Sequence, residues 1–473
     1  MAAQGARPHR TVATSQQANP GLIRQLGTVS ATALVVSNMV GTGIFTASGF
    51  LAGDLGRPDL FLLIWVAGAI AALAGAFCFS ELGVNYPSSG GEYVYLTRAY
   101  GPTWGFITGW VSFFAGFSAP IAIASLAFSD YLGFFYAPLK QANAAFQFGS
   151  GDWTFRIGAG QVAACCLIAG FTVLNVFGLS RVARIQNVLT LLKVGVLLAF
   201  VVFGLLAGRG DWAHFSQDAV RTSTSPLPQQ FVISLFWIYV SYSGWNAATY
   251  VAEEIRNPAR TLPIALAFGT ALVAALYLAL NVVYLYAAPL EEMKGVIAIG
   301  TLTSQKLFGP EIAGVFSALM ALSIMSTVSA MVTVGPRVYY AMARNGAFFS
   351  VAGKVHEKYR TPVVAILAQG VCAIIMTLTP FPQLFTYVGM TLNFTALLAV
   401  ASIFVFRRRR PDWQKLPVVS FAYPLVPSIF VITGAWMTVY AVTLQSRVSF
   451  AAILTVLLGA LVYHFRIRSR AAE

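Results

Sequence analysis

The sequence predicts an all-α integral membrane protein that crosses the bilayer with twelve transmembrane helices. Apolar residues make up 58% of the chain and the four charged types only 10%, whereas a soluble domain carries about 25% charged residues. A soluble fold cannot bury that much apolar surface. The 473 residues leave room for twelve helices of about 20 residues, the length that spans a bilayer. Intrinsic disorder, a disulfide-rich scaffold and a soluble enzyme are therefore excluded as fold classes.

Long apolar runs, separated by polar or glycine- and proline-containing connections, mark the expected spans. In chain order they cover residues 31–51, 60–80, 105–126, 158–177, 185–206, 231–252, 264–286, 312–333, 363–378, 384–406, 425–442 and 448–465.

The net charge of +14 indicates membrane topology rather than nucleic-acid binding. Lys and Arg concentrate in the loops that share a side with the N-terminus, which is the cytoplasmic side under the positive-inside rule. Residues 1–29 form a polar tail without an apolar core of signal-peptide length, so we expect the tail to be retained. The prediction is a multi-pass protein of the cell (inner) membrane with both termini in the cytoplasm.

Two spans are interrupted near their middle by glycine and hydroxyl residues. The first span contains the run from Ser37 to Phe45, and the sixth contains the run from Val240 to Asn246. They are five helices apart, so they begin two five-helix units that an odd helix count inserts in opposite orientations. This pattern is typical of an inverted-repeat transporter. The expected units are residues 30–208 and 209–410, followed by two helices and a cytoplasmic tail in 411–473.

A break at mid-membrane depth is tolerated only where it lines a cavity or lies within protein. It leaves amides at a half-helix N-terminus, which favour a carboxylate, and carbonyls that accept from an ammonium group. Both together suit a zwitterion such as an α-amino acid; the alternative is that small residues merely let helices pack closely. The expected substrate-binding residues are Met39, Val40, Gly41, Thr42, Gly43, Ile44, Val240, Ser241, Tyr242, Ser243 and Gly244.

Three motifs carry a family resemblance. They are Gly41-Thr42-Gly43-Ile44-Phe45, then Tyr242-Ser243-Gly244-Trp245-Asn246 with Glu253-Glu254 and Asn257-Pro258, and then Arg337-Val338-Tyr339-Tyr340 leading to Ala343-Arg344-Asn345-Gly346. Over residues 30–465 the sequence resembles the amino acid/polyamine/organocation superfamily, and most of all its L-type amino-acid transporter branch with the bacterial relatives. The resemblance implies a LeuT-like five-plus-five inverted repeat, two further helices and alternating access. It also implies that the Thr42 and Gly43 amides hold the substrate carboxylate, and the Met39, Val240 and Ser243 carbonyls its amine.

Lys193 lies inside the fifth span, where insertion costs about 2.5–3.5 kcal/mol. A lysine that snorkels to the interface is one explanation. The resemblance implies another, in which the ammonium group occupies the place of the sodium ion of sodium-coupled relatives, so that transport is sodium-independent. Burial can also lower a lysine pKa, which leaves Lys193 open as a titrating group. Its expected hydroxyl partners are Ser326, Thr327 and Ser329, although such hydroxyls often bond to their own helix backbone.

No carboxylate is expected deep in a span. Three glutamates lie near span ends and are expected to form structural or gating ion pairs with nearby arginines, with a proton relay as the alternative. A cationic substrate side chain would then lack a counter-charge, so a neutral amino acid is favoured. The glutamates are Glu81, Glu253 and Glu254, and the arginines are Arg98, Arg256 and Arg260.

Two positions depart from the family pattern. Val240 stands where many relatives place a gating aromatic residue, so Phe236, Trp237 and Tyr239 become the gating candidates. Residues 131–157 contain no cysteine, whereas the animal light-chain members use one there for a disulfide. We therefore expect no disulfide-linked heavy subunit.

The sequence lacks the motifs that enzyme, metal-binding and channel functions would require. The sequence has no metalloprotease motif, P-loop or His/Cys metal cluster, so we expect no enzyme activity, metal or cofactor. A channel would want repeated rings of carbonyls or charges. The prediction is a sodium-independent secondary transporter of neutral L-amino acids that works in a lipid bilayer, as an exchanger or linked to protons. The alternatives are a transport-inactive amino-acid sensor and a cationic amino-acid or polyamine carrier.

Overall fold

The computed structural model describes residues 24, 26–88, 90–149, 154–177, 179–206, 208–344, 346–359, 361–444 and 446–467; the side chains of 179–190, 444 and 446 are not described. The predicted N-terminal tail, apart from residues 24 and 26–29, and the C-terminal residues beyond 467 lie outside this range. Asn345 of the third motif lies outside it as well.

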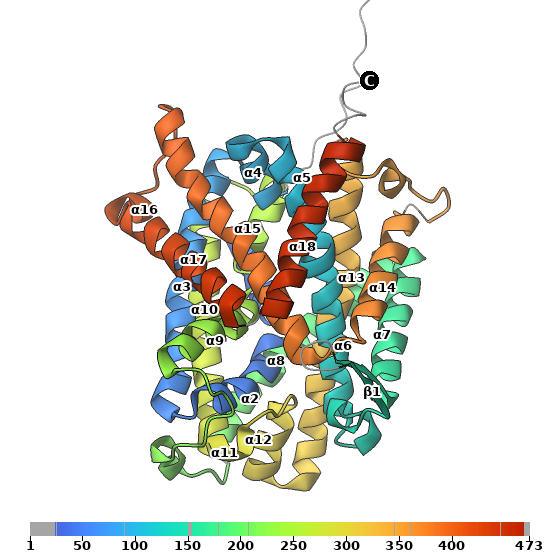
Figure 1. Cartoon of the computed structure of the whole chain (residues 1–473), viewed down its shortest axis with the longest axis vertical. Coiled ribbons are helices and arrows are strands. Elements are labelled where there is room, and N and C mark those ends of the chain that lie inside the picture. The colour runs from blue at the N-terminus through green and yellow to red at the C-terminus, as the bar shows by residue number, and fades with distance from the viewer. Residues whose placement is uncertain are drawn as a thin grey trace, which may run out of the picture.

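Long helices run along the long axis of the molecule (Figure 1). Within the described residues, eight are long and apolar enough to cross a membrane, or nine if the bent pair α1 (Thr28–Met39) and α2 (Gly43–Leu55) counts as one span. The eight are α3 (Pro58–Asn85), the continuous α5–η1–α6 (Pro102–Val111, Ser112–Ser118, Ala119–Leu132), α7 (Ala159–Val176), α10 (Pro258–Ala287), α13 (Pro310–Arg344), α15 (Phe381–Arg409), α17 (Leu425–Leu444) and α18 (Ser446–Val462).

Three other predicted spans correspond to shorter or divided helices. The fifth is α8 (Leu179–Leu206), whose described apolar part is Leu191–Leu206, and the ninth is the 14-residue α14 (Val363–Met376). The sixth is divided into α9 (Leu227–Tyr242) and the 3₁₀ segment η5 (Ala247–Glu254). The chain is therefore a multi-pass helical membrane protein, and the count of twelve spans stays a prediction.

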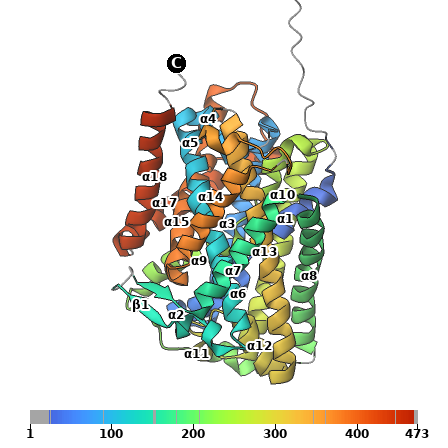
Figure 2. The same cartoon turned by 90° about the vertical axis from the view of Figure 1, so that its right-hand side faces the viewer.

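Short elements cover the two ends of the bundle. The helix α4 (Glu92–Tyr100) lies at one end, and α11 (Leu290–Met293) and α12 (Ile299–Phe308) lie at the other (Figures 1 and 2). An antiparallel hairpin of β1 (Phe146–Phe148) and β2 (Phe155–Ile157), with Phe146 paired to Ile157, lies beside α7. No pattern in the sequence predicts this hairpin. The remaining short elements are η2 (Ala137–Leu139), η3 (Gln141–Asn143), η4 (Trp212–Ser216), η6 (Ser350–Gly353), α16 (Pro417–Phe421) and η7 (Tyr463–Ile467).

The central helices are more deeply buried than the last two helices of the chain. The most apolar windows of α5–η1–α6 and α15 are 61% buried, whereas those of α17 and α18 are 28% and 17% buried. Exposed apolar side chains such as Leu457 and Leu461 cover α18. Apolar side chains on the outer surface are stable only against lipid or another apolar surface, so α17 and α18 lie at the periphery of the bundle.

A buried ion pair corrects one predicted pairing. Glu81, near the end of α3, was expected to pair with Arg98, but its carboxylate accepts two hydrogen bonds from Arg407 at 2.7 and 2.6 Å. The indole Nε1 of Trp413 and the backbone amide of Leu416 also donate to it, at 2.8 and 3.1 Å. The Glu81 side chain is fully buried. This cluster fastens α3 to the end of α15 and to the loop that follows it.

Candidate functional site

The first break separates α1 from α2. The two helices meet at an angle of 44°, and a tight turn joins them in which the Gly41 amide donates to the Met39 carbonyl at 2.7 Å. No side chain caps the N-terminus of α2. Thr42 is the residue before α2 and Gly43 and Ile44 are its first two residues, so their amides have no intrahelical acceptor. They form a half-helix N-terminus whose partial positive charge favours an anion.

The second break separates α9 from η5. Helix α9 ends at Tyr242, and Ser243 leaves the helical path with φ −55° and ψ 150°. Gly244 then adopts a φ of +98°, a conformation that residues other than glycine rarely adopt. The Ser243 amide donates to the Val240 carbonyl at 3.1 Å.

The two breaks contact each other at both glycines. A Cβ atom on Gly43 would lie 2.3 Å from the Cα atom of Ser241. A Cβ atom on Gly244 would lie 2.8 Å from the carbonyl carbon and oxygen of Asn38 and 3.0 Å from the Met39 amide nitrogen. The backbone of each broken helix therefore packs directly on the other, and the two predicted segments lie together in the fold.

One of the predicted carbonyls already accepts a hydrogen bond from a tyrosine that was not among the predicted site residues. The Tyr277 hydroxyl, on α10, donates to the Met39 carbonyl at 2.7 Å. This carbonyl also accepts from the Gly41 amide, so a substrate amine has to compete with two donors there. The carbonyls of Val240 and Ser243 are the less crowded part of the predicted amine site, with the Ser243 amide as the donor seen at Val240.

Two more tyrosines hold the backbone of α2. Tyr284 donates to the Ile44 carbonyl at 3.3 Å, and Tyr131, on α6, donates to the Phe45 carbonyl at 2.8 Å. Tyr277, Asn281 and Tyr284 are spaced i, i+4 and i+7 along α10 and so share a helix face. This polar stripe within an apolar span was the signal that could have found them.

Lys193 contacts the first broken helix. Its side chain is only 2% exposed, and Nζ donates to the Ser37 carbonyl of α1 at 3.1 Å. The three predicted hydroxyl partners on α13 are buried: Ser326, Thr327 and Ser329. The hydroxyls of Thr327 and Ser329 have no hydrogen-bond partner among the described residues. Thr327 also approaches the first break, since its Cγ2 lies 4.0 Å from the Cβ position of Gly41.

Aromatic rings form a layer on one side of the breaks. Trp237 stacks on Phe50 with centroids 4.5 Å apart and on Phe385 at 4.6 Å; Phe381 stacks on Phe50 at 5.8 Å. Trp237 lies three residues before Val240, about one turn earlier on α9. We call Phe50, Trp237, Phe381 and Phe385 the aromatic layer.

The other two gating candidates have different surroundings. Phe236 is buried and packs against Gly389 of α15. The Tyr239 hydroxyl donates to the Leu392 carbonyl at 3.1 Å. Trp237 is therefore the gating candidate that belongs to the aromatic layer.

A polar pocket of about 390 Å³ lies at this layer, and Phe50 and Trp237 form part of its wall. Asp54, Thr222, Gln230 and Thr386 also line it. The Asp54 carboxylate accepts from the Ser234 hydroxyl at 2.9 Å. Asp54 is the last residue but one of α2, three residues beyond the predicted first span.

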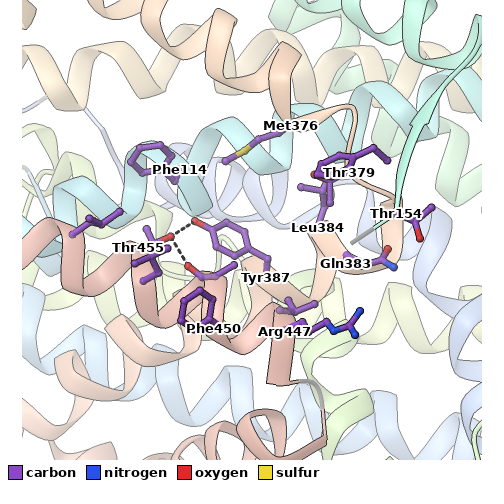
Figure 3. Close-up of a pocket in the computed structure, with 15 residues that line it drawn as sticks. Phe114, Thr154, Met376, Thr379, Gln383, Leu384, Tyr387, Arg447, Phe450 and Thr455 are labelled. Carbon is purple, nitrogen blue, oxygen red and sulfur yellow. Dashed lines mark hydrogen bonds between the residues drawn. The ribbon is translucent and has the colours of Figure 1, made fainter. Parts of the chain in front are cut away.

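A second cavity, of about 320 Å³, lies between α15, α18 and η1 (Figure 3). Its wall is largely apolar, and Tyr387 and Thr455 share a hydrogen bond of 2.9 Å within it. None of the predicted substrate-binding residues lines this cavity. The broken helices line two other cavities. The polar pocket at the aromatic layer is lined by Phe50 of α2 and Trp237 of α9, and a largely apolar cavity of about 290 Å³ is lined by Tyr239 and Tyr242 of α9 and by Trp245 of the second break.

Replacing Trp237 with alanine is expected to connect the polar pocket with the breaks. A cysteine at the buried position Ser241, in a variant whose four native cysteines are serines, should then react several-fold faster with a small water-soluble thiol reagent. A Trp237→Phe variant keeps a ring and should keep the labelling slow. Equal labelling in all three backgrounds would show that the aromatic layer does not close the path.

Within the described residues, no group of three or more His, Cys, Asp or Glu side chains is placed to hold a metal ion. The four cysteines are free, and Cys166 is the exposed one. The polar groups at the breaks include peptide groups, the Lys193 ammonium group, and the Asn246 amide with the Glu92 carboxyl group to which it donates.

Comparison with known proteins gives the family. A family model described as amino acid permease matches residues 26–462. The mouse large neutral amino acids transporter small subunit 2 is 28% identical over 422 residues, 88% of this chain and 77% of the relative. The serine/threonine exchanger SteT of Bacillus subtilis is 27% identical over 457 residues, 96% of this chain and 99% of the relative.

The human b(0,+)-type amino acid transporter 1 is 26% identical over 435 residues, 89% of this chain and 85% of the relative. All three names are those of transporters rather than enzymes. The resemblance to the amino acid/polyamine/organocation superfamily, which rested on three sequence motifs, is confirmed. The chain belongs to the amino acid permease family, within the amino acid/polyamine/organocation superfamily and near its L-type branch.

Proposed function

We propose that this protein is a sodium-independent secondary transporter of neutral L-amino acids that works by alternating access. The proposal includes twelve spans, a LeuT-like five-plus-five inverted repeat, and both termini in the cytoplasm. It also includes function without a disulfide-linked heavy subunit. The names of the relatives support amino acids as substrates.

The observation that carries the proposal is the contact between the two breaks. Three uncapped amides lie at the start of α2, and Gly43 packs on Ser241 near the end of α9. The contacts are so close that Gly43 and Gly244 leave no space for a side chain. The amides suit a carboxylate, and the carbonyls of Val240 and Ser243 suit an ammonium group. In this arrangement the residues from Met39 to Ile44 and from Val240 to Gly244 bind the substrate backbone.

A neutral side chain fits the charges near the breaks better than a cationic one. Asp54 lies eleven residues beyond Gly43, which is about 16 Å along a helix. Lys193 adds a positive charge beside α1. A cationic side chain held beside α1 would be repelled by this ammonium group, which costs free energy in a low-dielectric site. The Glu92 carboxyl group near the second break already accepts a hydrogen bond from Asn246.

Sodium independence rests on the contact that Lys193 makes. Its ammonium group donates to a carbonyl of the first broken helix, so a fixed cation already stabilises that carbonyl end. Lys193→Ala is expected to lower transport at least about tenfold, because hydrogen bonds to charged groups contribute about 1.5–3 kcal/mol. The fold should be retained, as thermal unfolding of the purified variant would show.

Gly195→Ala is the matched control for this test, since Gly195 lies on the same helix with open space around its Cβ position. It should transport like the wild type. Wild-type activity in the Lys193→Ala variant would contradict the role of the ammonium group.

Uptake of radiolabelled amino acids into proteoliposomes tests the proposed function. We expect neutral L-amino acids to be taken up and to compete with one another, at the same rate when choline replaces sodium. Exchange would appear as uptake that requires amino acid inside the vesicle. Ligand binding without flux would instead indicate a sensor, and competition by lysine or putrescine alone would indicate a cationic amino-acid or polyamine carrier.

A further inference from the structure

Glu92 has a buried carboxyl group that has no role in the proposed transport function as described above. It is the first residue of α4, in the connection between α3 and α5, and only 8% of it is exposed. Asn246 Nδ2 donates to its Oε1 at 3.1 Å. Asn246 belongs to the second break, two residues after Gly244, so the carboxyl group is in direct contact with the unwound part of the sixth span.

The backbone fixes this contact closely. Gly90 and Gly91 precede Glu92 with φ values of +124° and +49°, which allow the chain to turn sharply into α4. A Cβ atom on Gly91 would lie 2.7 Å from the Tyr250 ring of η5. Asn246 Nδ2 also contacts the Tyr250 hydroxyl at 3.3 Å. The N-terminus of α4 therefore packs against η5, and a movement of η5 away from α4 would uncover Glu92.

The groups that face Glu92 are neutral at ordinary pH. They are Asn246 and Tyr250 from the second break and η5, Tyr239 from α9, Thr395 from α15 and Tyr95 from α4 itself. No lysine or arginine is among them in the part of the chain that the structure describes. A carboxylate without a cation in a buried site is unstable unless it is well hydrogen-bonded.

We propose that Glu92 and Asn246 form a proton-dependent latch between α4 and the second broken helix, so that protonation of Glu92 holds this end of the protein closed. This inference rests on the proposed transport function and adds the group through which protons act on it. The proton bonds to a carboxylate oxygen of Glu92 when η5 covers it, and leaves to water when η5 moves away.

The direction of the pH effect follows from burial. Burial raises the pKa of Glu92 from 4.5 to about 7, and hydrogen bonds from Thr395 and Asn246 oppose this rise. An uncovered, hydrated glutamate titrates near its ordinary value of about 4.3. Below pH 7 the closed arrangement therefore holds a proton that the open one releases, and acid stabilises the closed arrangement. As the pH rises through 7, this stabilisation is lost and opening becomes easier.

Amino-acid exchange in proteoliposomes with equal pH on both sides tests the latch. Wild-type exchange should be about tenfold slower at pH 6 than at pH 8, the ratio for one group that titrates near pH 7. Glu92→Gln mimics the protonated carboxyl, so its exchange should stay slow and flat over this range. Glu357→Gln, the same change on an exposed loop residue, should keep the wild-type profile.

The pH profile of an Asn246→Ala variant is a second, independent test, because this variant keeps the Glu92 carboxyl group. It deletes a donor that favours the ionised form, so the midpoint of the pH profile should move to higher pH. A Glu92→Gln protein that folds, transports and keeps the wild-type pH profile would overturn the latch. A wild-type protein without exchange at any pH would overturn the proposed function instead, and the two failures are thus distinguishable.

Discussion

Gly43→Leu is expected to abolish amino-acid transport. The Cβ atom of any side chain at this position would lie 2.3 Å from the Cα atom of Ser241, and backbone atoms of a packed helix cannot move aside as the tip of a flexible side chain can. Overpacking costs about 1–3 kcal/mol even in tolerant cores, and about 1.4 kcal/mol changes a binding constant tenfold. Gly43→Ala should therefore lower uptake about tenfold or more, and leucine should leave none detectable.

Gly170→Ala is the control for this comparison. Gly170 lies on the exposed side of α7, where a new Cβ atom would contact nothing within 4 Å. Its uptake and thermal unfolding should match the wild type. Thermal unfolding of the Gly43 variants separates loss of the site from loss of the fold, and wild-type uptake by Gly43→Leu would contradict the close contact of the two breaks.

Glu81→Ala is expected to cause the largest loss of stability. It leaves the Arg407 guanidinium, whose side chain is 6% exposed, without its carboxylate in a buried site. Removing one partner of a buried ion pair costs about 3–5 kcal/mol. The thermal unfolding temperature in detergent should fall clearly, while transport per folded molecule should change little, because the cluster binds α3 to α15 away from the breaks.

Two further variants make this prediction specific. Asp59→Asn removes a carboxylate from an ion pair with Arg57 in which the side chains are 51% and 59% exposed, and such pairs contribute about 0–1 kcal/mol. A Glu81→Met, Arg407→Met double variant removes both buried charges, so it should recover part of the lost stability. An unfolding temperature of Glu81→Ala equal to that of Asp59→Asn would show that the buried pair contributes nothing.

Local sequence pattern predicts the helices and the positions of the breaks. Apolar runs locate the spans because lipid requires them, and glycines at 41, 43 and 244 weaken two of those spans at similar depth. The turn to +98° at Gly244 and the uncapped start of α2 follow from these same residues. The hairpin of two three-residue strands is too short to leave a recognisable period.

Long-range partners could not be predicted in the same way. Tyr277 reaches the Met39 carbonyl across 238 positions of sequence, and Arg407 reaches Glu81 across 326. Such pairs depend on how helices pack against one another, and the sequence of each span alone does not determine this packing. For the same reason the ring at Trp237, one turn from Val240, became identifiable as part of the aromatic layer only through its stacking on Phe50.

The most direct measurement is the structure of the purified protein with the neutral amino acid that competes best in uptake. We expect the ligand carboxylate within hydrogen-bond distance of the amides of Thr42 and Gly43, and its ammonium group beside the carbonyls of Val240 and Ser243. A ligand bound only in the polar pocket at the aromatic layer, or in the apolar cavity between α15 and α18, would contradict binding by the two broken helices.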